Sequence, residues 1–173
     1  MRNWKTKEIQ ARRAIEDRGF RVHDANIVFG ENCPNIDLIV YSKNMAQYIQ
    51  VKSSEVPATK NGVVIDGSPW TDDQLYNHAP IFNKHDHFQA KLVLIVDKLK
   101  TGETNFYIVP PPDLEMLVRE RGVEFAKRPK RDGTPRSINF RKELSRDVLS
   151  IWHNAWYLLG EAPQSIGGVD ACI

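Results

Sequence analysis

Hydrophobic residues along the chain follow two spacings, one typical of helices and one typical of strands. Apolar residues three or four positions apart predict helices over residues 4–18, 113–121 and 144–159. Short apolar or alternating runs predict strands over residues 20–29, 37–42, 46–53, 63–65, 92–96 and 106–109. The order of a helix, then strands, then helices indicates a single α/β domain with a central mixed β-sheet flanked by helices.

Several local signals set the boundaries of these elements. Gly19 and Gly122 follow the first two periodic segments, where a glycine commonly ends a helix. The short connection at residues 42–45 predicts that segments 37–42 and 46–53 pair as a hairpin. The run 92–96 is almost entirely apolar, which is typical of an interior strand covered on both faces. Thr71 is a candidate cap for a short helix that ends near residue 77.

Polar side chains interrupt the two strands of the predicted hairpin. Asp37 begins the first strand, and Gln50 and Lys52 lie near the end of the second. Since side chains alternate between the faces of a strand, Gln50 and Lys52 point to the same face. Pairing of the two strands therefore brings an acid, an amide and an ammonium group to one end of the sheet. Each residue taken alone also fits a structural role, as a strand-end acid or as the solvated face of an edge strand.

These residues suit the hydrolysis of a phosphodiester, which requires charge neutralisation, an activated water and a stabilised leaving group. Bound Mg²⁺ supplies all three and prefers oxygen ligands. We expect Asp37 to supply a carboxylate, Gln50 an amide oxygen and Val51 a backbone carbonyl. Lys52 is the candidate for orienting or deprotonating the water and for offsetting negative charge. Glu8 in the first helix is a candidate second carboxylate, with Glu16 on the same helix as its competitor.

The order of these residues resembles the PD-(D/E)xK nuclease superfamily, in which a helical Glu precedes a strand with Asp and a strand with (D/E)xK. Here the matching elements are Glu8, Pro34-Asn35-Ile36-Asp37 and Gln50-Val51-Lys52. The helix resembles the one that opens archaeal Holliday junction resolvases, and the Gln-Val-Lys strand is similar to Mrr-type restriction nucleases. The resemblance implies a restriction-endonuclease-like fold and an endonuclease that cuts DNA to leave a 5′-phosphate, with Mg²⁺ or Mn²⁺ as cofactor.

Gln50 departs from the acidic residue of the family pattern. A neutral amide removes one negative charge, so metal affinity should fall unless Glu8, Glu31 or Glu55 compensates. Because Mrr-type nucleases carry Gln at this position, we interpret the site as active. The alternative is a catalytically inactive nucleic-acid-binding module that keeps the nuclease fold. A protein-interaction subunit is a third hypothesis, and restriction, repair and junction resolution are not distinguished.

Composition adds few constraints, but the distribution of charge adds one. The formal net charge is only +2, yet basic residues gather near the N-terminus and in residues 127–136. The candidate DNA-backbone contacts are Ser53, Lys127, Arg128, Lys130, Arg131 and Arg136. Cutting both strands favours a homodimer, with the predicted last helix as a candidate interface.

The chain shows neither a signal-peptide pattern nor a stretch of about 20 apolar residues, which favours a cytoplasmic protein without a membrane span. Residues 1–160 are expected to form the domain and residues 161–173 a loose tail. A second metal site at His85-Asp86-His87 with His78 lacks a convincing fourth ligand. Trp70 and Tyr76 are minor candidates for a substrate groove.

Overall fold

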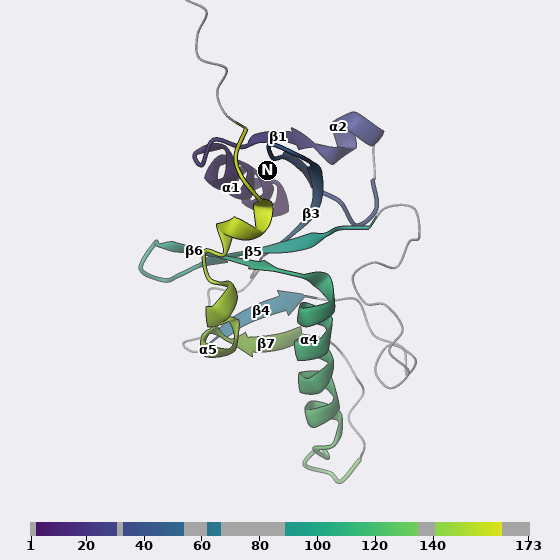
Figure 1. Cartoon of the computed structure of the whole chain (residues 1–173). Helices are drawn as coiled ribbons and strands as arrows, with labels where there is room; N and C mark the ends of the chain where they lie inside the picture. Colours follow the sequence, from purple (N-terminus) through teal and green to yellow (C-terminus); the bar gives the residue numbers. More distant parts are fainter. Residues whose placement is uncertain (1–2, 31–32, 54–61, 67–88, 135–140, 164–173) are drawn as a thin grey trace, which may run out of the picture.

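Two β-sheets organise the chain in the computed structural model, which describes residues 3–30, 33–53, 62–66, 89–134 and 141–163 (Figure 1). The larger sheet has five strands in the order β1-β2-β3-β5-β6. Their bounds are β1 Arg21–Asp24, β2 Leu38–Tyr41, β3 Ala46–Ser53, β5 Leu92–Lys98 and β6 Thr104–Val109. The smaller sheet pairs β4, Gly62–Asp66, with β7, Arg141–Ser145.

The larger sheet is mixed, as the sequence predicts. β3 pairs antiparallel with β2 on one side and parallel with β5 on the other. The β1–β2 and β5–β6 pairs are antiparallel. β5 is buried from Leu92 to Asp97, which confirms the interior strand expected from its apolar run. The protein is therefore an α/β structure whose sheet places the ends of β3 and β5 side by side.

Helix α1, Asn3–Glu16, covers one face of the five-stranded sheet and confirms the predicted helix over 4–18. Ala11 and Ile15 are fully buried and pack against Ile49 of β3 and Leu94 of β5. The helix ends before Gly19, whose φ of +83° is a conformation that a residue without a Cβ adopts without strain. This packing places the first turns of α1 near the ends of the central strands.

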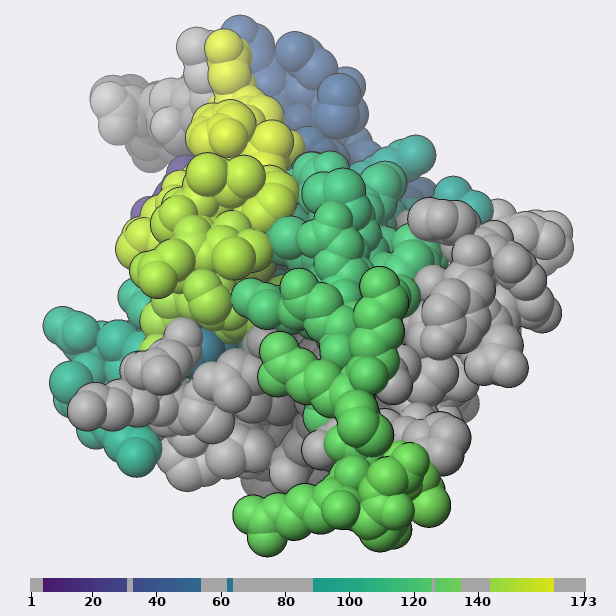
Figure 2. Space-filling view, turned by 90° about the horizontal axis from the view of Figure 1, so that it is seen from below, coloured from purple at the N-terminus to yellow at the C-terminus, as the bar shows by residue number. Residues whose placement is uncertain are grey.

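Helix α4, Pro111–Ala126, covers the opposite face together with the β4–β7 pair (Figure 1). Leu114 and Val118 of the helix pack with Val93 and Ile95 of β5. The prediction that α4 stops at Gly122 is wrong, because the helix continues to Ala126. Hydrophobic contacts on either side of the glycine, from Val118 and Val123, offset the roughly 1 kcal/mol that glycine costs inside a helix. The end of α4 protrudes from the body (Figure 2).

The predicted strand over residues 20–29 is only half correct. It begins as β1 and ends at Asp24, after which Ala25–Phe29 form the short helix α2. The Asp24 side chain accepts a hydrogen bond of 2.8 Å from the backbone N–H of Asn26 and so caps α2. A cap of this kind overrides the strand propensity of Ile27 and Val28.

The predicted helix over residues 144–159 is wrong. Leu144 belongs to β7, and Ser145 caps α5, Arg146–Leu149, by accepting from the Val148 N–H. Two 3₁₀ segments follow, η1 at Ser150–Trp152 and η2 at Trp156–Leu159. Asn154 between them has a φ of +52°, which an α-helix does not allow. The apolar residues that suggested one helix face belong to different elements. Leu144 lies in β7, Leu149 in α5 and Leu159 in η2, and each is buried.

Other predictions vary in outcome. β4 confirms the strand at 63–65, and β6 confirms the strand at 106–109. The helix expected near Thr71 lies outside the described residues. Division into a domain, residues 1–160, and a loose tail, residues 161–173, stays a prediction. Within the ranges listed above, no helix combines the length and the hydropathy needed to cross a bilayer.

Candidate active site

Asp37 is held at the start of β2 by hydrogen bonds to two other elements. Its backbone N–H donates to the Ile49 carbonyl of β3 at 2.9 Å, and its carbonyl accepts from the Ala25 N–H of α2 at 3.0 Å. Its side-chain Oδ2 accepts from the Val51 N–H at 2.6 Å. The carboxylate is therefore fixed beside the strand that carries Gln50 and Lys52, as the hairpin prediction requires.

Gln50 and Lys52 lie on the face of β3 that points away from α1. Ile49 and Val51 pack into the cluster beneath α1, so the alternation of the strand directs Gln50 and Lys52 the other way. Gln50 is only 9% exposed, and its Oε1 is a buried atom without a hydrogen-bond partner in the described structure. A buried amide oxygen without a partner is costly, so a cation bound to this atom would remove that cost.

The carboxyl group of Asp37 has a raised pKa. Burial is the largest cause, and the negative charge of Asp24 adds to it. The Val51 N–H and the positive charge of Lys52 act in the opposite direction but do not cancel the burial. Lys52 therefore lies close enough to influence Asp37 electrostatically. A cation bound beside Asp37 would favour its ionised form.

Glu8 of α1 shares a pocket with Asp37 and Asp24. The pocket has a volume of about 740 Å³. Burial, followed by the negative charges of Asp37 and Asp24, raises the pKa of Glu8 to about 7, while the positive charge of Lys5 opposes them. Three carboxylates from α1, the end of β1 and the start of β2 thus face one space. Gln50 and Lys52 are not among the residues that line it.

The donor set fits a hard divalent cation. Mg²⁺ is usually bound through one or two carboxylates and keeps several waters. Glu8 and Asp37 are such a pair, and Gln50, beside the pocket rather than in its lining, carries an amide oxygen without a partner among the described residues. The backbone C=O of Val51 points to the same side of β3 as its N–H, which faces Asp37. Among the described residues, no three Asp, Glu, His or Cys side chains are close enough to form a metal site by themselves. Neutral oxygens, from the protein or from water, would therefore complete such a site.

The remaining predicted residues lie elsewhere. Ser53 is the last, half-buried residue of β3. Lys127, Arg128, Lys130 and Arg131 are exposed in the segment that follows α4. This end of α4 lies far from α1, the helix that carries Glu8 (Figure 1). Arg136, the histidines at 78, 85 and 87, Trp70 and Tyr76 lie outside the described residues.

Sequence reasoning missed two polar residues near the site. Asp24 lines the pocket, and the signal that could have revealed it is its position as an acid directly before a potential helix. Lys7 is buried although it is a lysine. The signal there is its place four residues before Ala11, on the apolar side of the predicted helix.

No protein-family model matches the chain, and no curated protein matches its sequence. Among solved structures, the chain is similar to a bacterial homing endonuclease, I-Ssp6803I. The identity is 17%, the alignment covers 90% of this chain and 88% of that chain, and the TM-score is 0.49. The function proposed below rests on the geometry of the site.

Proposed function

We propose that the protein is a metal-dependent endonuclease that hydrolyses phosphodiester bonds of DNA. One observation carries the proposal: the Asp37 carboxylate lies in one pocket with Glu8 while accepting the N–H of Val51, between Gln50 and Lys52. Both carboxyl groups have a raised pKa, and the charge of Asp37 contributes to that of Glu8, so a bound cation would favour the ionised form of both. The adjacent lysine supplies the positive charge that a phosphate substrate requires.

In this proposal Asp37 and Glu8 hold Mg²⁺ or Mn²⁺, and the Gln50 Oε1 and the Val51 carbonyl are the neutral ligands. The bound ion supplies positive charge at the phosphate and lowers the pKa of a water. The protein keeps the carboxylates in place, because Asp37 is tied by backbone hydrogen bonds to α2 and β3. Gln50 adds an oxygen without adding charge to a pocket that already contains three carboxylates.

Lys52 is proposed to orient the attacking water and to stabilise negative charge on the phosphate. Its positive charge already acts on Asp37, so both groups lie at the same end of β3. The residue is half-buried, and partial burial strengthens its attraction for an anion relative to a lysine in bulk water.

DNA is the proposed substrate because it presents phosphodiesters in a regular array. The exposed cations in residues 127–131, at the protruding end of α4, suit sequence-independent contacts with its backbone. A homodimer would bring two such sites to the two strands. The predicted dimer helix is absent, so the interface is not proposed to lie there.

Cleavage assays test the enzyme. We expect linear or supercoiled DNA to be cut in Mg²⁺ or Mn²⁺ and not in a chelator. Asp37→Ala and Lys52→Ala should each reduce the rate by about 100-fold or more, as loss of a group that stabilises the transition state does. Lys100→Ala, in the exposed turn between β5 and β6, is the matched control and should cut at the parental rate. Equal cleavage by all three variants would refute the assigned site.

A second candidate function is DNA binding without cleavage. Gln50 favours it, because the described residues hold no trio of charged or thiol ligands and the site depends on neutral oxygens. This alternative predicts salt-sensitive DNA binding with no cleavage of linear, supercoiled, single-stranded, branched or methylated DNA in either metal. Binding that persists in Lys52→Ala, together with an inactive parent, would establish it.

A further inference from the structure

Lys7 occupies a position on α1 that would normally hold an apolar residue. Between residues 5 and 16 of the helix the buried positions are 7, 11, 14 and 15, the spacing of a single helix face. Ala11, Ala14 and Ile15 pack onto the sheet as this pattern requires. Lys7 is only 8% exposed and continues the same stripe toward the start of the helix. A charged residue at such a position usually has a specific reason to be there.

The head of Lys7 lies near the C-terminal end of β5. The positive charge of Lys98 and the negative charge of Asp97, the last two residues of β5, both act on Lys7. Val96 packs beneath α1, so Lys98 lies on the α1 side of the strand and Asp97 on the other side. β3 runs parallel beside β5, with Ser53 opposite Val96. Lys7 is therefore close to the end of the strand that carries Gln50 and Lys52.

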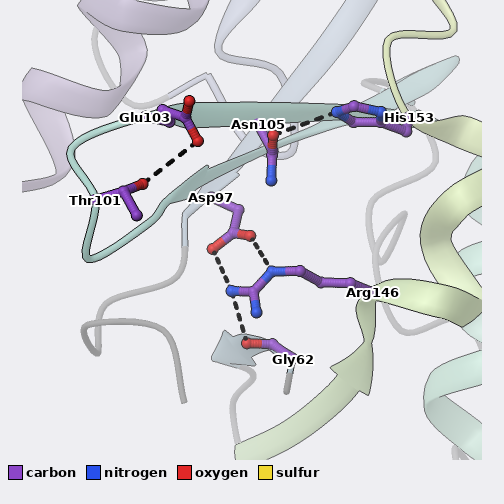
Figure 3. A network of polar contacts seen from close by, with 7 residues as sticks. All are labelled: Gly62, Asp97, Thr101, Glu103, Asn105, Arg146 and His153. Carbon is purple, nitrogen blue, oxygen red and sulfur yellow. Dashed lines mark hydrogen bonds and ion pairs between the residues drawn. The ribbon is translucent and has the colours of Figure 1, made fainter. Parts of the chain in front are cut away.

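The nearby carboxylate is already engaged. Asp97 is fully buried and accepts from Arg146 Nε at 2.9 Å and from Nη2 at 3.4 Å. Arg146 also donates to the Gly62 carbonyl, as Figure 3 shows. In the part of the chain that the structure describes, Lys7 has no hydrogen-bond or ion-pair partner. Its ammonium is not among the enclosed polar atoms that lack a partner, so it remains accessible to an anion.

We propose that Lys7, with Lys98 beside it, binds a backbone phosphate of the DNA strand next to the phosphate at Asp37 and Lys52. The proposal rests on the proposed function. β5 lies about 4.8 Å from β3, and Lys98 is three residues beyond Ile95, the residue that pairs with Lys52, so the backbone positions of the two lysines are about 10 Å apart along the strands and on opposite faces of the sheet. A bound phosphate would give the ammonium of Lys7 a negative partner that none of the described residues provides, and Lys98 would add to the attraction.

Lys7→Met tests this assignment, because methionine fills the same volume on an apolar stripe without the charge. The variants are made in an Asp37→Asn background, so that binding is measured without cleavage. We expect Lys7→Met to weaken binding of a DNA duplex by about tenfold near 100 mM salt. The slope of log K against log salt should fall by about 0.9, the contribution of one phosphate contact. Lys7→Arg should keep most of the parental affinity and slope.

Arg13→Met is the matched control, since it removes the same charge from the exposed side of α1. It should leave the slope unchanged. Thermal melting of Lys7→Met should occur at or above the parental temperature, which excludes unfolding as the cause of weaker binding. If Lys7→Met kept the parental affinity and the parental salt slope, the proposed phosphate contact would be wrong. The proposed endonuclease activity would be unaffected by that result, provided that Lys52→Ala abolishes cleavage. A parent that binds no DNA at low salt would overturn both proposals.

Discussion

Burial by distant segments gives single residues their chemistry in this protein. Glu8 lies on a helix with several charged residues, and nothing in its local sequence distinguishes it from Glu16. In the structure Glu16 is exposed and pairs with Arg12 at 2.7 Å. Glu8 instead faces Asp37 and Asp24 across a pocket, and its pKa is raised to about 7. The residues that surround each glutamate in the folded protein therefore decide which of the two is the candidate metal ligand.

The raised pKa of Glu8 predicts how its replacement changes stability. A carboxyl group with a raised folded pKa stabilises the fold fully below its unfolded pKa, here 4.5, and loses that contribution as the pH rises through about 7. Without divalent ions, Glu8→Gln should therefore melt at the parental temperature at pH 4 and a few degrees higher at pH 8. Thermal unfolding followed by circular dichroism at the two pH values measures the difference.

Glu16→Gln is the control for this experiment. It removes an exposed ion pair worth about 0.5 kcal/mol or less, so it should melt slightly below the parent at pH 8. If Glu8→Gln were no more stable than the parent at pH 8, Glu8 would not be held in a repulsive pocket.

Among the secondary-structure elements, the Asp97–Arg146 ion pair joins the two sheets. Asp97 belongs to β5 of the larger sheet, and Arg146 begins α5 directly after β7 of the smaller one. Arg146 also reaches the carbonyl of Gly62 in β4 (Figure 3). One guanidinium thus contacts elements that lie far apart in the sequence, and the helix predicted over 144–159 would not have revealed this role.

Loss of Arg146 should destabilise the fold strongly, because it leaves a fully buried carboxylate without its partner. We expect Arg146→Met to reduce the free energy of unfolding by about 3–5 kcal/mol, measured by urea denaturation. Addition of Asp97→Asn should recover part of the loss, since the unpaired charge is then removed. Arg121→Met, which breaks an exposed pair with Glu124, should cost less than about 1 kcal/mol. If Arg146→Met also reduced the free energy of unfolding by less than about 1 kcal/mol, the Asp97–Arg146 ion pair would not be what holds the two sheets together.

For the whole molecule, a bound metal should act as a ligand that stabilises the folded state. The pocket gathers carboxylates from α1, β1 and the start of β2, which come together only when the sheet is formed. An ion that binds this arrangement must therefore stabilise the folded chain, by about 2.7 kcal/mol when its concentration is 100 times the dissociation constant.

This stabilisation should depend on pH. In the proposed site Glu8 binds the ion in its ionised form, and its pKa is about 7, so Mg²⁺ or Mn²⁺ should raise the melting temperature more at pH 8 than at pH 5. Thermal melts with and without the ion at each pH measure the effect. Asp37→Asn should lose most of the increase at pH 8. An equal increase at both pH values, or one retained by Asp37→Asn, would place the ion elsewhere.

The sequence by itself determined the helix α1, the hairpin of β2 and β3, the interior strand β5 and the position of Asp37 beside the strand that carries Gln50 and Lys52. These features depend on local periodicity, and pairing of adjacent strands follows from a short connection. Periodicity reports which positions are buried but not the structure that buries them. For that reason it predicted that the first strand continues past Asp24 to residue 29, and it predicted a single helix over residues 144–159.

Only the tertiary structure decided which polar residues meet. Asp24, Glu8 and Asp37 share a pocket because α1 packs over strands that follow it in the chain. Lys7 became a candidate phosphate ligand because Arg146, more than a hundred positions away, occupies the carboxylate nearby. Desolvation and charge act through space, so the pKa of Glu8 and the partner that Lys7 lacks depend on contacts that no local pattern encodes.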